Sequence, residues 1–281
     1  MSIHHRDAPP PGAVKQITSL ANPIVKEIRG LALPKNRKAS GLFVAEGLKL
    51  VADAAEAGWT IRTLLHAANV GGQPMVSRLA AGAYARGGTV IAVSEAVLAK
   101  ISRRDNPQTV LGVFEQRTIA VDAIRPGRDD VWIALEAVRD PGNLGTIVRT
   151  ADAVGAKGVI LVGETVDPFS VEAVRATMGS VFHVPIARAG FAEFARLAKR
   201  WPGAVVGTHL SGKADYRQAQ YRAPVLLVMG GEQAGLTADA AQLCGTLVKI
   251  PMAGKADSLN LAVATAVMLF EIRRGALKLD G

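Results

Sequence analysis

From Val131 onward, the chain alternates short apolar runs with longer stretches of helical spacing. The short runs are rich in Val, Leu and Ile and predict buried strands at Val131 to Leu135, Gly158 to Val162, Ala204 to Gly207, Val225 to Met229 and Leu247 to Ile250. The longer stretches repeat apolar residues every three or four positions and predict helices at Leu144 to Val154, Val171 to Met178, Phe191 to Arg200 and Ser258 to Arg274. Because alternating strands and helices form parallel sheets, residues 131–281 are predicted to be an α/β domain with a mostly parallel sheet.

A second, smaller α/β domain is predicted for residues 14–116. Its apolar runs predict strands at Leu42 to Ala45, Ile61 to Leu65, Thr89 to Val93 and Val110 to Phe114, and its helical spacing covers Asn22 to Leu31, Gly47 to Ala57 and Met75 to Arg86. Residues 117–130 contain Arg125-Pro126-Gly127-Arg128, which is typical of turns, and are interpreted as a linker. Residues 1–13 are polar and proline-rich, without the apolar stretch of a secretion signal, and are interpreted as a disordered tail.

The chain is basic, and the excess of positive charge is uneven. The formal net charge is +9, and residues 1–116 hold 14 Lys and Arg against 8 Asp and Glu. Such a surplus in one half suggests a polyanion partner, although a generally Arg-rich protein would show the same charge. The single cysteine, Cys244, excludes an intramolecular disulfide and fits a cytoplasmic location. No apolar run reaches the ~18 residues that span a membrane.

Several common cofactor motifs are missing from the sequence. No strand is followed by the Gly-x-Gly-x-x-Gly of dinucleotide-binding folds, and no Gly-x-x-x-x-Gly-Lys-Ser/Thr phosphate loop is present. The five histidines and one cysteine do not have the spacing of a zinc site. We therefore expect no metal.

Three loops rich in glycine and amide side chains follow predicted strands of the second domain. The first runs from Glu136 to Arg149, the second from Met229 to Leu236 and the third from Lys249 to Leu261. Ligands of open α/β sheets bind beyond the carboxyl ends of the strands, where all three loops are expected to lie. The sequence therefore predicts one site built from three loops.

Each polar residue of these loops has an ordinary structural explanation when it is taken alone. Asn143 and Ser258 are suited to cap helices, Arg149 to a solvated helix surface and Glu232 to an exposed turn. Asn260 is less easily explained, because it is expected inside the first turn of the last helix, where asparagine is unfavourable. Only the combination of the three loops favours a functional site.

Together, the loops resemble the three signature motifs of the SpoU/TrmH family of SPOUT RNA methyltransferases over about Val131 to Arg274. The motifs are Asp140-Pro141-x-Asn143-x-Gly145 followed by Arg149, then Gly230-x-Glu232-x-x-Gly235-Leu236, then Ile250-Pro251-Met252 followed by Ser258-Leu259-Asn260. One departure is Gln233, where many relatives carry glycine. The first domain is similar to the ribosomal-protein-like substrate-binding domain of many members, through Ile17-Thr18-Ser19, Asn22-Pro23, Phe43-Val44-Ala45-Glu46-Gly47 and Pro107-Gln108.

The resemblance implies a fold, a reaction and site residues. Its catalytic domain carries a deep trefoil knot, and its members act as homodimers that methylate a ribose 2′-hydroxyl of RNA with S-adenosylmethionine. The implied catalytic residues are Arg149, Asn143, Glu232, Ser258 and Asn260. The implied cofactor-binding residues are Met229, Gly230, Gly231, Gly235, Ile250, Met252, Ser258 and Leu259. The basic residues expected to contact RNA phosphates are Lys26, Arg29, Lys35, Arg37, Lys38, Arg103 and Arg104.

Arg149 occupies the family position that contacts the reacting hydroxyl. Because a guanidinium is effectively never deprotonated, we expect it to position the ribose, stabilise the emerging alkoxide or pair with a phosphate. Ribosomal RNA is the favoured substrate, and transfer RNA is the alternative. Three other hypotheses stay open at this point: an RNA base methyltransferase of a related knotted family, a non-catalytic ribosome-assembly factor, and a small-molecule enzyme.

Overall fold

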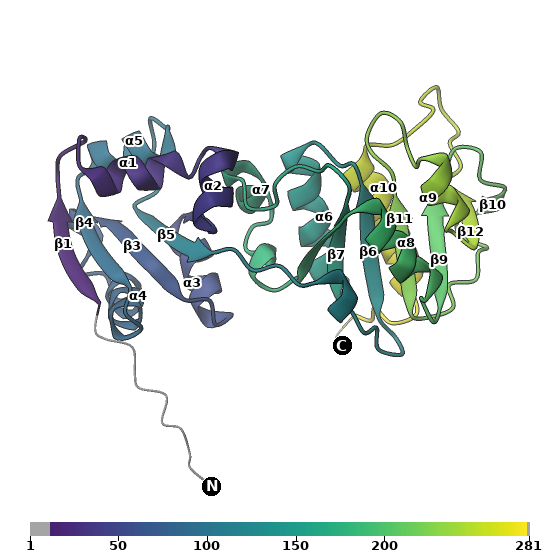
Figure 1. Cartoon of the computed structure of the whole chain (residues 1–281), viewed down its shortest axis with the longest axis horizontal. Helices are drawn as coiled ribbons and strands as arrows, with labels where there is room; N and C mark the ends of the chain where they lie inside the picture. The colour runs from purple at the N-terminus through teal and green to yellow at the C-terminus, as the bar shows by residue number, and fades with distance from the viewer. Residues whose placement is uncertain (1–11, 280–281) are drawn as a thin grey trace, which may run out of the picture. The chain divides into compact units, whose positions relative to one another are not determined.

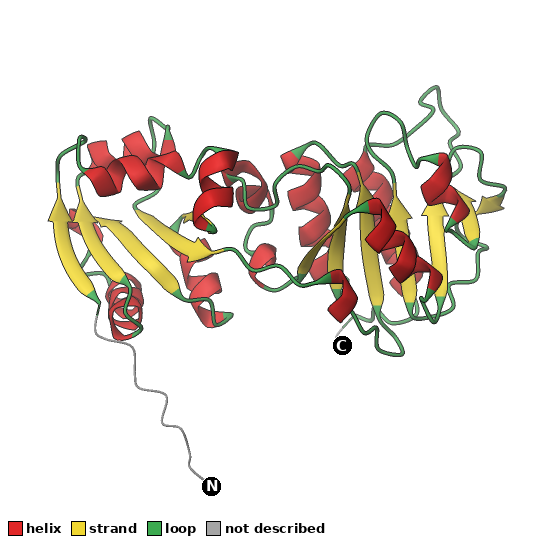
Figure 2. Ribbon diagram, in the orientation of Figure 1, coloured by secondary structure: helices red, strands yellow, loops and turns green. Residues whose placement is uncertain are grey.

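A computed structural model describes residues 12–279 and divides the chain into two α/β units (Figures 1 and 2). The first unit ends at Gln116 and also contains Phe169–Arg175. The second unit contains Arg117–Pro168 and continues from Ala176. Within residues 12–279, no helix is long and apolar enough to cross a membrane.

The first unit is built on a mixed five-stranded sheet. Its strands, in spatial order, are β1 (Ala13–Ile17), β4 (Thr89–Val93), β3 (Ile61–Ala67), β5 (Val110–Glu115) and β2 (Leu42–Glu46). β4 pairs in parallel with β1 and β3, whereas β5 runs antiparallel to β3 and β2. β1 is the strand of this sheet that the sequence analysis did not predict. Its residues are mostly exposed, so they lack an apolar pattern.

Five helices cover the two faces of this sheet. They are α1 (Pro23–Gly30), α2 (Pro34–Ser40), α3 (Leu48–Glu56), α4 (Pro74–Ala85) and α5 (Glu95–Ser102). α1 and α5 pack together on one side, and α3 and α4 pack together on the other (Figure 1). α1 begins where the Asn22 side chain accepts a hydrogen bond from the Ile24 amide and Pro23 takes the first helical position.

The segment 169–175 contributes to the core of the first unit although it comes from the middle of the second unit's sequence. Phe169 is 1% exposed, and its ring centroid lies 4.8 Å from that of Phe43. Arg175, on α7 (Val171–Ala176), forms an ion pair with Glu46, whose side chain is only 5% exposed. The sequence analysis placed these residues with the second domain, because an apolar pattern does not reveal which core will receive it.

The second unit is built on a seven-stranded sheet in which every pair of neighbours is parallel. Its strands, in spatial order, are β10 (Ala214–Asp215), β12 (Thr246–Lys249), β9 (Ala204–Thr208), β11 (Val225–Met229), β6 (Val131–Glu136), β7 (Gly158–Val162) and β8 (Ile186–Ala189). The predicted α/β class with a mostly parallel sheet is confirmed. The trefoil knot stays a prediction.

The long helices of the second unit lie on both faces of this sheet (Figure 1). α6 (Pro141–Ala153) and α10 (Leu261–Arg273) pack against each other on one face. α8 (Phe191–Lys199) lies on the other, where Phe194 packs with alternate residues of β6, Trp132 and Ala134. The short helix α9 (Ala238–Gln242) adds Ala240 to the same cluster.

The structure places the expected linker within the second unit. Within residues 117–130, Ile119 forms a bridge with Ala187, and the side chains of Val121 and Ile124 are buried in the core beside α8. This segment therefore belongs to the second unit, because its apolar residues fill that core. Most of the expected tail, residues 1–11, lies outside the described residues, but Ala13 already belongs to β1.

Candidate functional site

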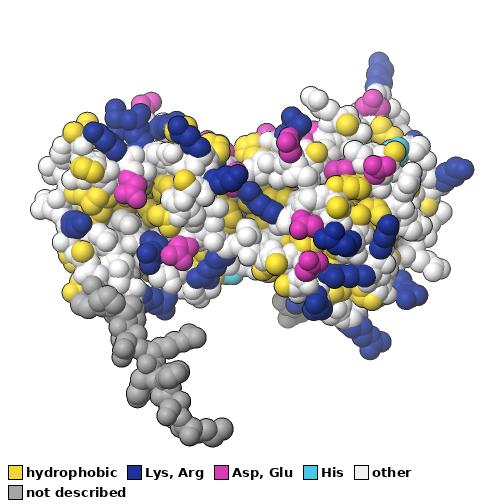
Figure 3. All heavy atoms as spheres, in the orientation of Figure 1, with side chains coloured by type: hydrophobic (Ala, Val, Ile, Leu, Met, Phe, Trp, Pro, Cys, Tyr) yellow, Lys and Arg dark blue, Asp and Glu magenta, His cyan; other side chains and the backbone are white. Residues whose placement is uncertain are grey.

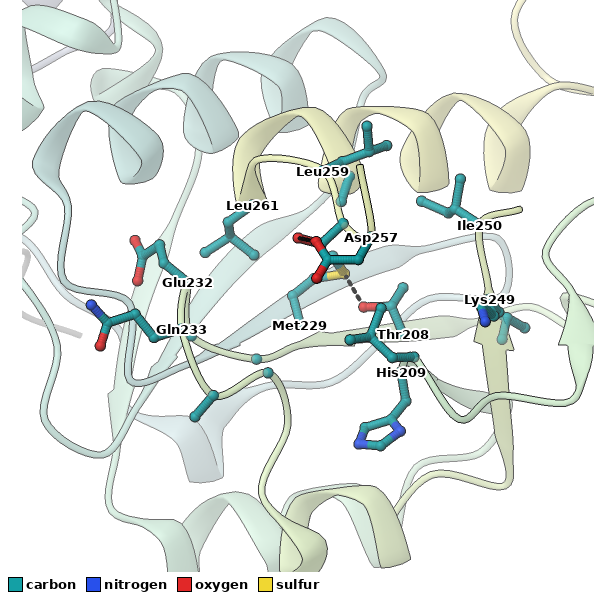
Figure 4. Close-up of a pocket in the computed structure, with 18 of the residues that line it drawn as sticks. Thr208, His209, Met229, Glu232, Gln233, Lys249, Ile250, Asp257, Leu259 and Leu261 are labelled. Atoms are coloured by element: carbon teal, nitrogen blue, oxygen red, sulfur yellow. Dashed lines mark hydrogen bonds between the residues drawn. The ribbon is translucent and has the colours of Figure 1, made fainter. Parts of the chain in front are cut away.

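The second and third loops line a single cavity of about 240 Å³ in the second unit (Figure 4). They follow β11 and β12, whose carboxyl ends lie at the same edge of the parallel sheet. The cavity is lined by all eight residues implied to bind the cofactor: Met229, Gly230, Gly231, Gly235, Ile250, Met252, Ser258 and Leu259. The structure thus brings together side chains that the sequence separates by up to thirty positions.

The cavity combines apolar walls with polar groups at its ends. Glu232 and Gln233 lie at one end and Ile250 and Lys249 at the other (Figure 4). Between them, the Thr208 hydroxyl donates to the sulfur of Met229 at 3.3 Å. Such a mixture suits a ligand that has apolar ring faces as well as charged or hydroxyl groups.

The glycines of the second loop are needed for its shape. A Cβ added to Gly230 would lie 1.9 Å from the backbone carbon of Gly235, and Gly231 forms a backbone bridge with Gly235. Gly235 itself has a φ of +66°, a conformation that favours glycine. The loop therefore folds back on itself and presents its backbone to the cavity.

Glu232 connects the second loop to the first. Its carboxylate accepts hydrogen bonds from the Arg139 amide at 3.3 Å, the Asp140 amide at 3.2 Å and the Asn143 side-chain amide at 3.2 Å. Partial burial raises the pKa of this carboxyl, but the hydrogen bonds it accepts outweigh burial and hold the pKa below its ordinary value. Glu232 is thus stabilised as an anion that organises the loops, and its oxygens are already engaged.

Asn143 and Asn260 extend this connection to the third loop. The Asn260 side-chain amide donates to Asn143 Oδ1 at 2.9 Å. The Asn260 Oδ1 accepts from the Ala262 amide at 2.9 Å and the Val263 amide at 3.3 Å, which caps α10. The Glu232–Asn143–Asn260 network therefore ties all three loops together.

Asn143 and Ser258 do not cap the helices that the sequence analysis assigned to them. α10 begins one residue after Asn260, so Asn260 is the cap and does not lie inside the first turn. Ser258 instead donates from its hydroxyl to Asp257 Oδ1 at 3.2 Å. At the start of α6, the capping side chain is Asp140, which accepts from the Asn143 amide at 2.6 Å. This arrangement leaves the Asn143 side chain available for the network.

Arg149 lies apart from the cavity. It is an exposed residue of α6, whose neighbours Leu144, Ile147 and Val148 are buried, and it does not line the cavity of its own chain. The structure therefore brings four of the five implied catalytic residues into the cavity wall or its supporting network and leaves Arg149 outside.

Six of the seven basic residues expected to contact RNA have accessible side chains. Lys26, Arg29, Lys35, Lys38 and Arg103 are exposed, and Arg104 is partly exposed. Figure 3 shows Lys and Arg side chains gathered over α1 and α5. Arg37 is a wrong prediction, because it is 2% exposed and donates to the carbonyl oxygens of Leu31 at 2.8 Å and Ala32 at 3.0 Å. The guanidinium of Arg37 therefore provides hydrogen bonds to the carbonyl groups that follow the last turn of α1.

The sequence analysis missed several residues of the cavity wall: Thr208, His209, Leu210, Asp257, Leu261 and Ala264. Thr208–Leu210 directly follow the predicted strand at Ala204 to Gly207, so the same strand-end argument would have found them. Glu136 was also missed. This buried carboxylate accepts from the amide and hydroxyl of Thr237, at 2.9 and 2.7 Å, and fixes the end of β6 to the start of α9.

Comparison with protein families gives two matches. Residues 130–270 match the SpoU rRNA Methylase family, and residues 22–112 match the MRM3-like substrate binding domain. The chain is 33% identical over 272 residues to the 23S rRNA (uridine(2479)-2′-O)-methyltransferase of Streptomyces viridochromogenes, covering 93% of both chains. It is 30% identical over 261 residues to the 23S rRNA (guanosine(2553)-2′-O)-methyltransferase RlmP of Bacillus subtilis, covering 92% of this chain and all of the relative.

Solved structures agree with these matches. The AdoMet-bound rRNA methyltransferase from Sinorhizobium meliloti is 55% identical, with a TM-score of 0.90 over 95% of this chain and 100% of that one. An RNA 2′-O ribose methyltransferase is 34% identical, with a TM-score of 0.79 over 93% of this chain and 99% of that one. Both structures extend across the two units, so the similarity is not confined to the cavity.

Proposed function

Because this chain belongs to the SpoU rRNA methylase family, we propose that it transfers a methyl group from S-adenosylmethionine to a ribose 2′-hydroxyl of 23S rRNA. The observation that carries the proposal is the cavity whose wall and supporting network combine the three loops. Two relatives that match more than nine-tenths of this chain are named as 23S rRNA 2′-O-methyltransferases, although for different nucleotides. The substrate position is therefore left to experiment.

The cavity fits S-adenosylmethionine in its chemistry. Met229, Ile250 and Leu259 offer apolar surface for an adenine ring, and the folded loop at Gly230 offers backbone groups rather than side chains. Lys249 and Asp257 supply opposite charges for an amino-acid carboxylate and ammonium. The bound cofactor supplies an electrophilic methyl group on a sulfonium.

The residues of the chain divide into positioning and substrate-contacting groups. Asn143, Glu232 and Asn260 hold the loops in place, and Ser258 lies in the cavity wall. Arg149 orients the ribose and stabilises negative charge on its oxygen, because a guanidinium donates hydrogen bonds but does not remove a proton. The exposed basic residues of the first unit bind RNA phosphates.

A homodimer explains the position of Arg149. α10 exposes 50% of Val263 and 52% of Phe270, although a helix with apolar residues on all sides is normally covered. α6, which carries Arg149, packs against α10. A second copy that covers this surface would place the Arg149 of one copy at the cavity of the other.

The reaction is tested with S-adenosylmethionine that carries a labelled methyl group and total RNA from cells lacking the protein. We expect label in alkali-resistant dinucleotides, because 2′-O-methylation blocks cleavage at that ribose. Label in a free base would replace the proposal with base methylation. Cofactor binding without label in mature or immature ribosomal RNA would favour a non-catalytic assembly factor.

The role of Arg149 is tested by Arg149→Ala. We expect loss of methyl transfer with cofactor affinity within about twofold of wild type, since the role proposed for Arg149 is to contact the ribose and not the cofactor. Arg196→Ala is the matched control, because it removes an exposed arginine from α8 on the opposite face of the sheet. Substantial turnover by Arg149→Ala would refute the assignment.

The shared site is tested by mixing two inactive variants. Gly230→Val prevents the second loop from folding back on itself, because a Cβ there would lie 1.9 Å from the backbone carbon of Gly235, and Arg149→Ala removes the guanidinium. In a homodimer with shared sites, co-expressed variants form a mixed dimer with one intact site, so about a quarter to a half of the activity returns. If isolated mixed dimers are inactive, the Arg149 guanidinium and the cavity that it serves belong to the same copy.

A further inference from the structure

The first unit contains a second cavity, also of about 240 Å³, between α3 and α4. Its floor is apolar and comes from buried residues, including Trp59, Ile61 and Leu79. This cavity belongs entirely to residues 52–86, so it is separate from the cofactor cavity of the second unit.

Small residues on both helices create this hollow. α3 contributes Ala52 and Ala55, and α4 contributes Gly82 and Ala83. A Cβ added to Gly82 would meet no atom within 4 Å. Since glycine inside a helix costs about 1 kcal/mol relative to alanine, the open space at this position is not explained by stability.

Charged side chains surround the apolar floor. Arg78 of α4, Arg86 just after the end of α4 and Glu56 of α3 are exposed at the cavity. No ion pair joins any of them to another residue in the 12–279 range. The two arginines lie eight residues apart, or about 12 Å along a helix axis. This arrangement complements a flat ring that carries anionic groups.

We propose that this cavity binds one unpaired nucleotide of the RNA substrate and prefers guanine. The apolar floor covers the base, and Arg78 and Arg86 bind the adjoining phosphates. Glu56 selects guanine, because N1–H and N2–H of guanine place two neighbouring donors opposite one carboxylate, whereas other bases offer a single such group. This proposal rests on the proposed function, since it assumes an RNA substrate.

The test uses methyl-labelled methionine in the full-length protein and follows each methyl group by NMR. Met75 lines the nucleotide cavity, whereas Met229 and Met252 line the cofactor cavity. Met75 is assigned from the signal lost in Met75→Leu. Guanosine, adenosine, cytidine and uridine 5′-monophosphates are titrated separately to about 10 mM, and S-adenosylmethionine is titrated in a parallel sample.

We expect guanosine monophosphate to shift the Met75 signal saturably, at least fivefold more tightly than the other nucleotides. Gly82→Leu, which fills the hollow, should abolish the shift, and the Arg78→Ala, Arg86→Ala double variant should weaken binding at least tenfold. Glu56→Gln should remove the guanine preference. Arg62→Ala is the matched control, because it removes an exposed arginine of the same unit outside the cavity.

An unshifted Met75 signal with all four nucleotides would overturn the proposal, and so would an equal shift with inorganic phosphate alone. The signals of Met229 and Met252 report separately on the proposed function. If S-adenosylmethionine leaves both unshifted while guanosine monophosphate shifts Met75, the cofactor proposal fails and the nucleotide cavity stands. If S-adenosylmethionine shifts Met229 and Met252 while no nucleotide shifts Met75, only the proposal for the nucleotide cavity fails.

Discussion

Replacing Asn143 with aspartate tests the network that connects the three loops. The Asn143 amide nitrogen lies 3.2 Å from Glu232 Oε1 and donates to it. Asn143→Asp keeps the size of the side chain and an oxygen that can accept from Asn260. It replaces the donor to Glu232 with a second carboxylate. The substitution therefore perturbs one contact and leaves the backbone of α6 unchanged.

The expected cost follows from this geometry. A hydrogen bond to a charged group contributes about 1.5–3 kcal/mol. Two unit charges about 4 Å apart repel by roughly 4 kcal/mol at an effective dielectric constant of 20, and solvent around the exposed Glu232 reduces this to about half. The total of about 3.5–5 kcal/mol corresponds to a loss of roughly 300- to 5000-fold in kcat/KM.

The double variant Asn143→Asp, Glu232→Gln gives a sharper result. The glutamine amide can donate to the new carboxylate, which removes the repulsion. Its nitrogen then takes the place of Oε1, which also accepts from the Asp140 amide, so the recovery is partial. We expect the double variant to exceed Asn143→Asp in kcat/KM by at least tenfold, as measured with labelled cofactor and ribosomal RNA. Calorimetric binding of S-adenosylmethionine should recover in parallel.

The reasoning is refuted if the losses in kcat/KM caused by Asn143→Asp and Glu232→Gln simply multiply in the double variant. If the double variant loses the product of the two single losses, Asn143 and Glu232 act independently and the contact between them has no energetic role. If cofactor binding recovers but methyl transfer does not, Asn143 contacts the RNA directly, and its description as a positioning residue is wrong.

The remaining predictions concern packing and the thiol. Phe169→Ala should lower the free energy of unfolding of the first unit by about 3–5 kcal/mol, measured by urea unfolding through Trp59 fluorescence with the other two tryptophans replaced by phenylalanine. Arg37→Ala should cost about 2–4 kcal/mol because it leaves buried carbonyls unsatisfied, whereas Lys38→Ala should weaken RNA binding without a change in stability. Burial raises the pKa of the Cys244 thiol to about 12, and the carboxylate of Glu136 adds to this shift, so iodoacetamide should alkylate it at neutral pH only after unfolding.

The pH dependence of the network has a defined sign. The pKa of Glu232 is below its ordinary value of 4.5 in the folded protein. Its contribution to stability is therefore fully present above 4.5 and is lost as the pH falls through the lower pKa of the folded state. We expect Glu232→Gln to remove this acid-side dependence of the free energy of unfolding, measured by urea unfolding at several pH values. An unchanged dependence would assign it to another carboxylate.

The parallel sheet and much of the cavity wall were accessible from the sequence, whereas the order of the strands was not predicted. Apolar runs that alternate with helices predict parallel strands, and parallel strands place their following loops at one edge. This argument was sufficient for Met229 and Ile250. It fails for β1, because an edge strand with exposed residues has no apolar signal.

The network was not accessible in the same way. Asn143 and Glu232 are 89 residues apart, and Asn143 and Asn260 are 117 residues apart, so no local pattern connects them. Each of these residues taken alone fits a cap or a turn. Arg37 was assigned to RNA binding because it lies in a cluster of basic residues. The sequence gives no sign that its guanidinium instead donates to the backbone carbonyls of Leu31 and Ala32.

The two cavities differ in how their walls are held, and the difference agrees with the proposed ligands. The cofactor cavity is fixed by a loop that glycine alone can form and by hydrogen bonds through Glu232 and Asn143, so its shape is set before a ligand arrives. The nucleotide cavity is shaped by small side chains, and its charged residues are held by no ion pair within the described chain. A cofactor is identical in every turnover, so a rigid wall minimises the ordering cost of binding. An RNA nucleotide arrives within a larger molecule, and side chains such as Arg78 and Arg86 can adjust to it. Selection of the RNA can therefore change through the residues that surround the second cavity while the methyl-transfer site stays intact.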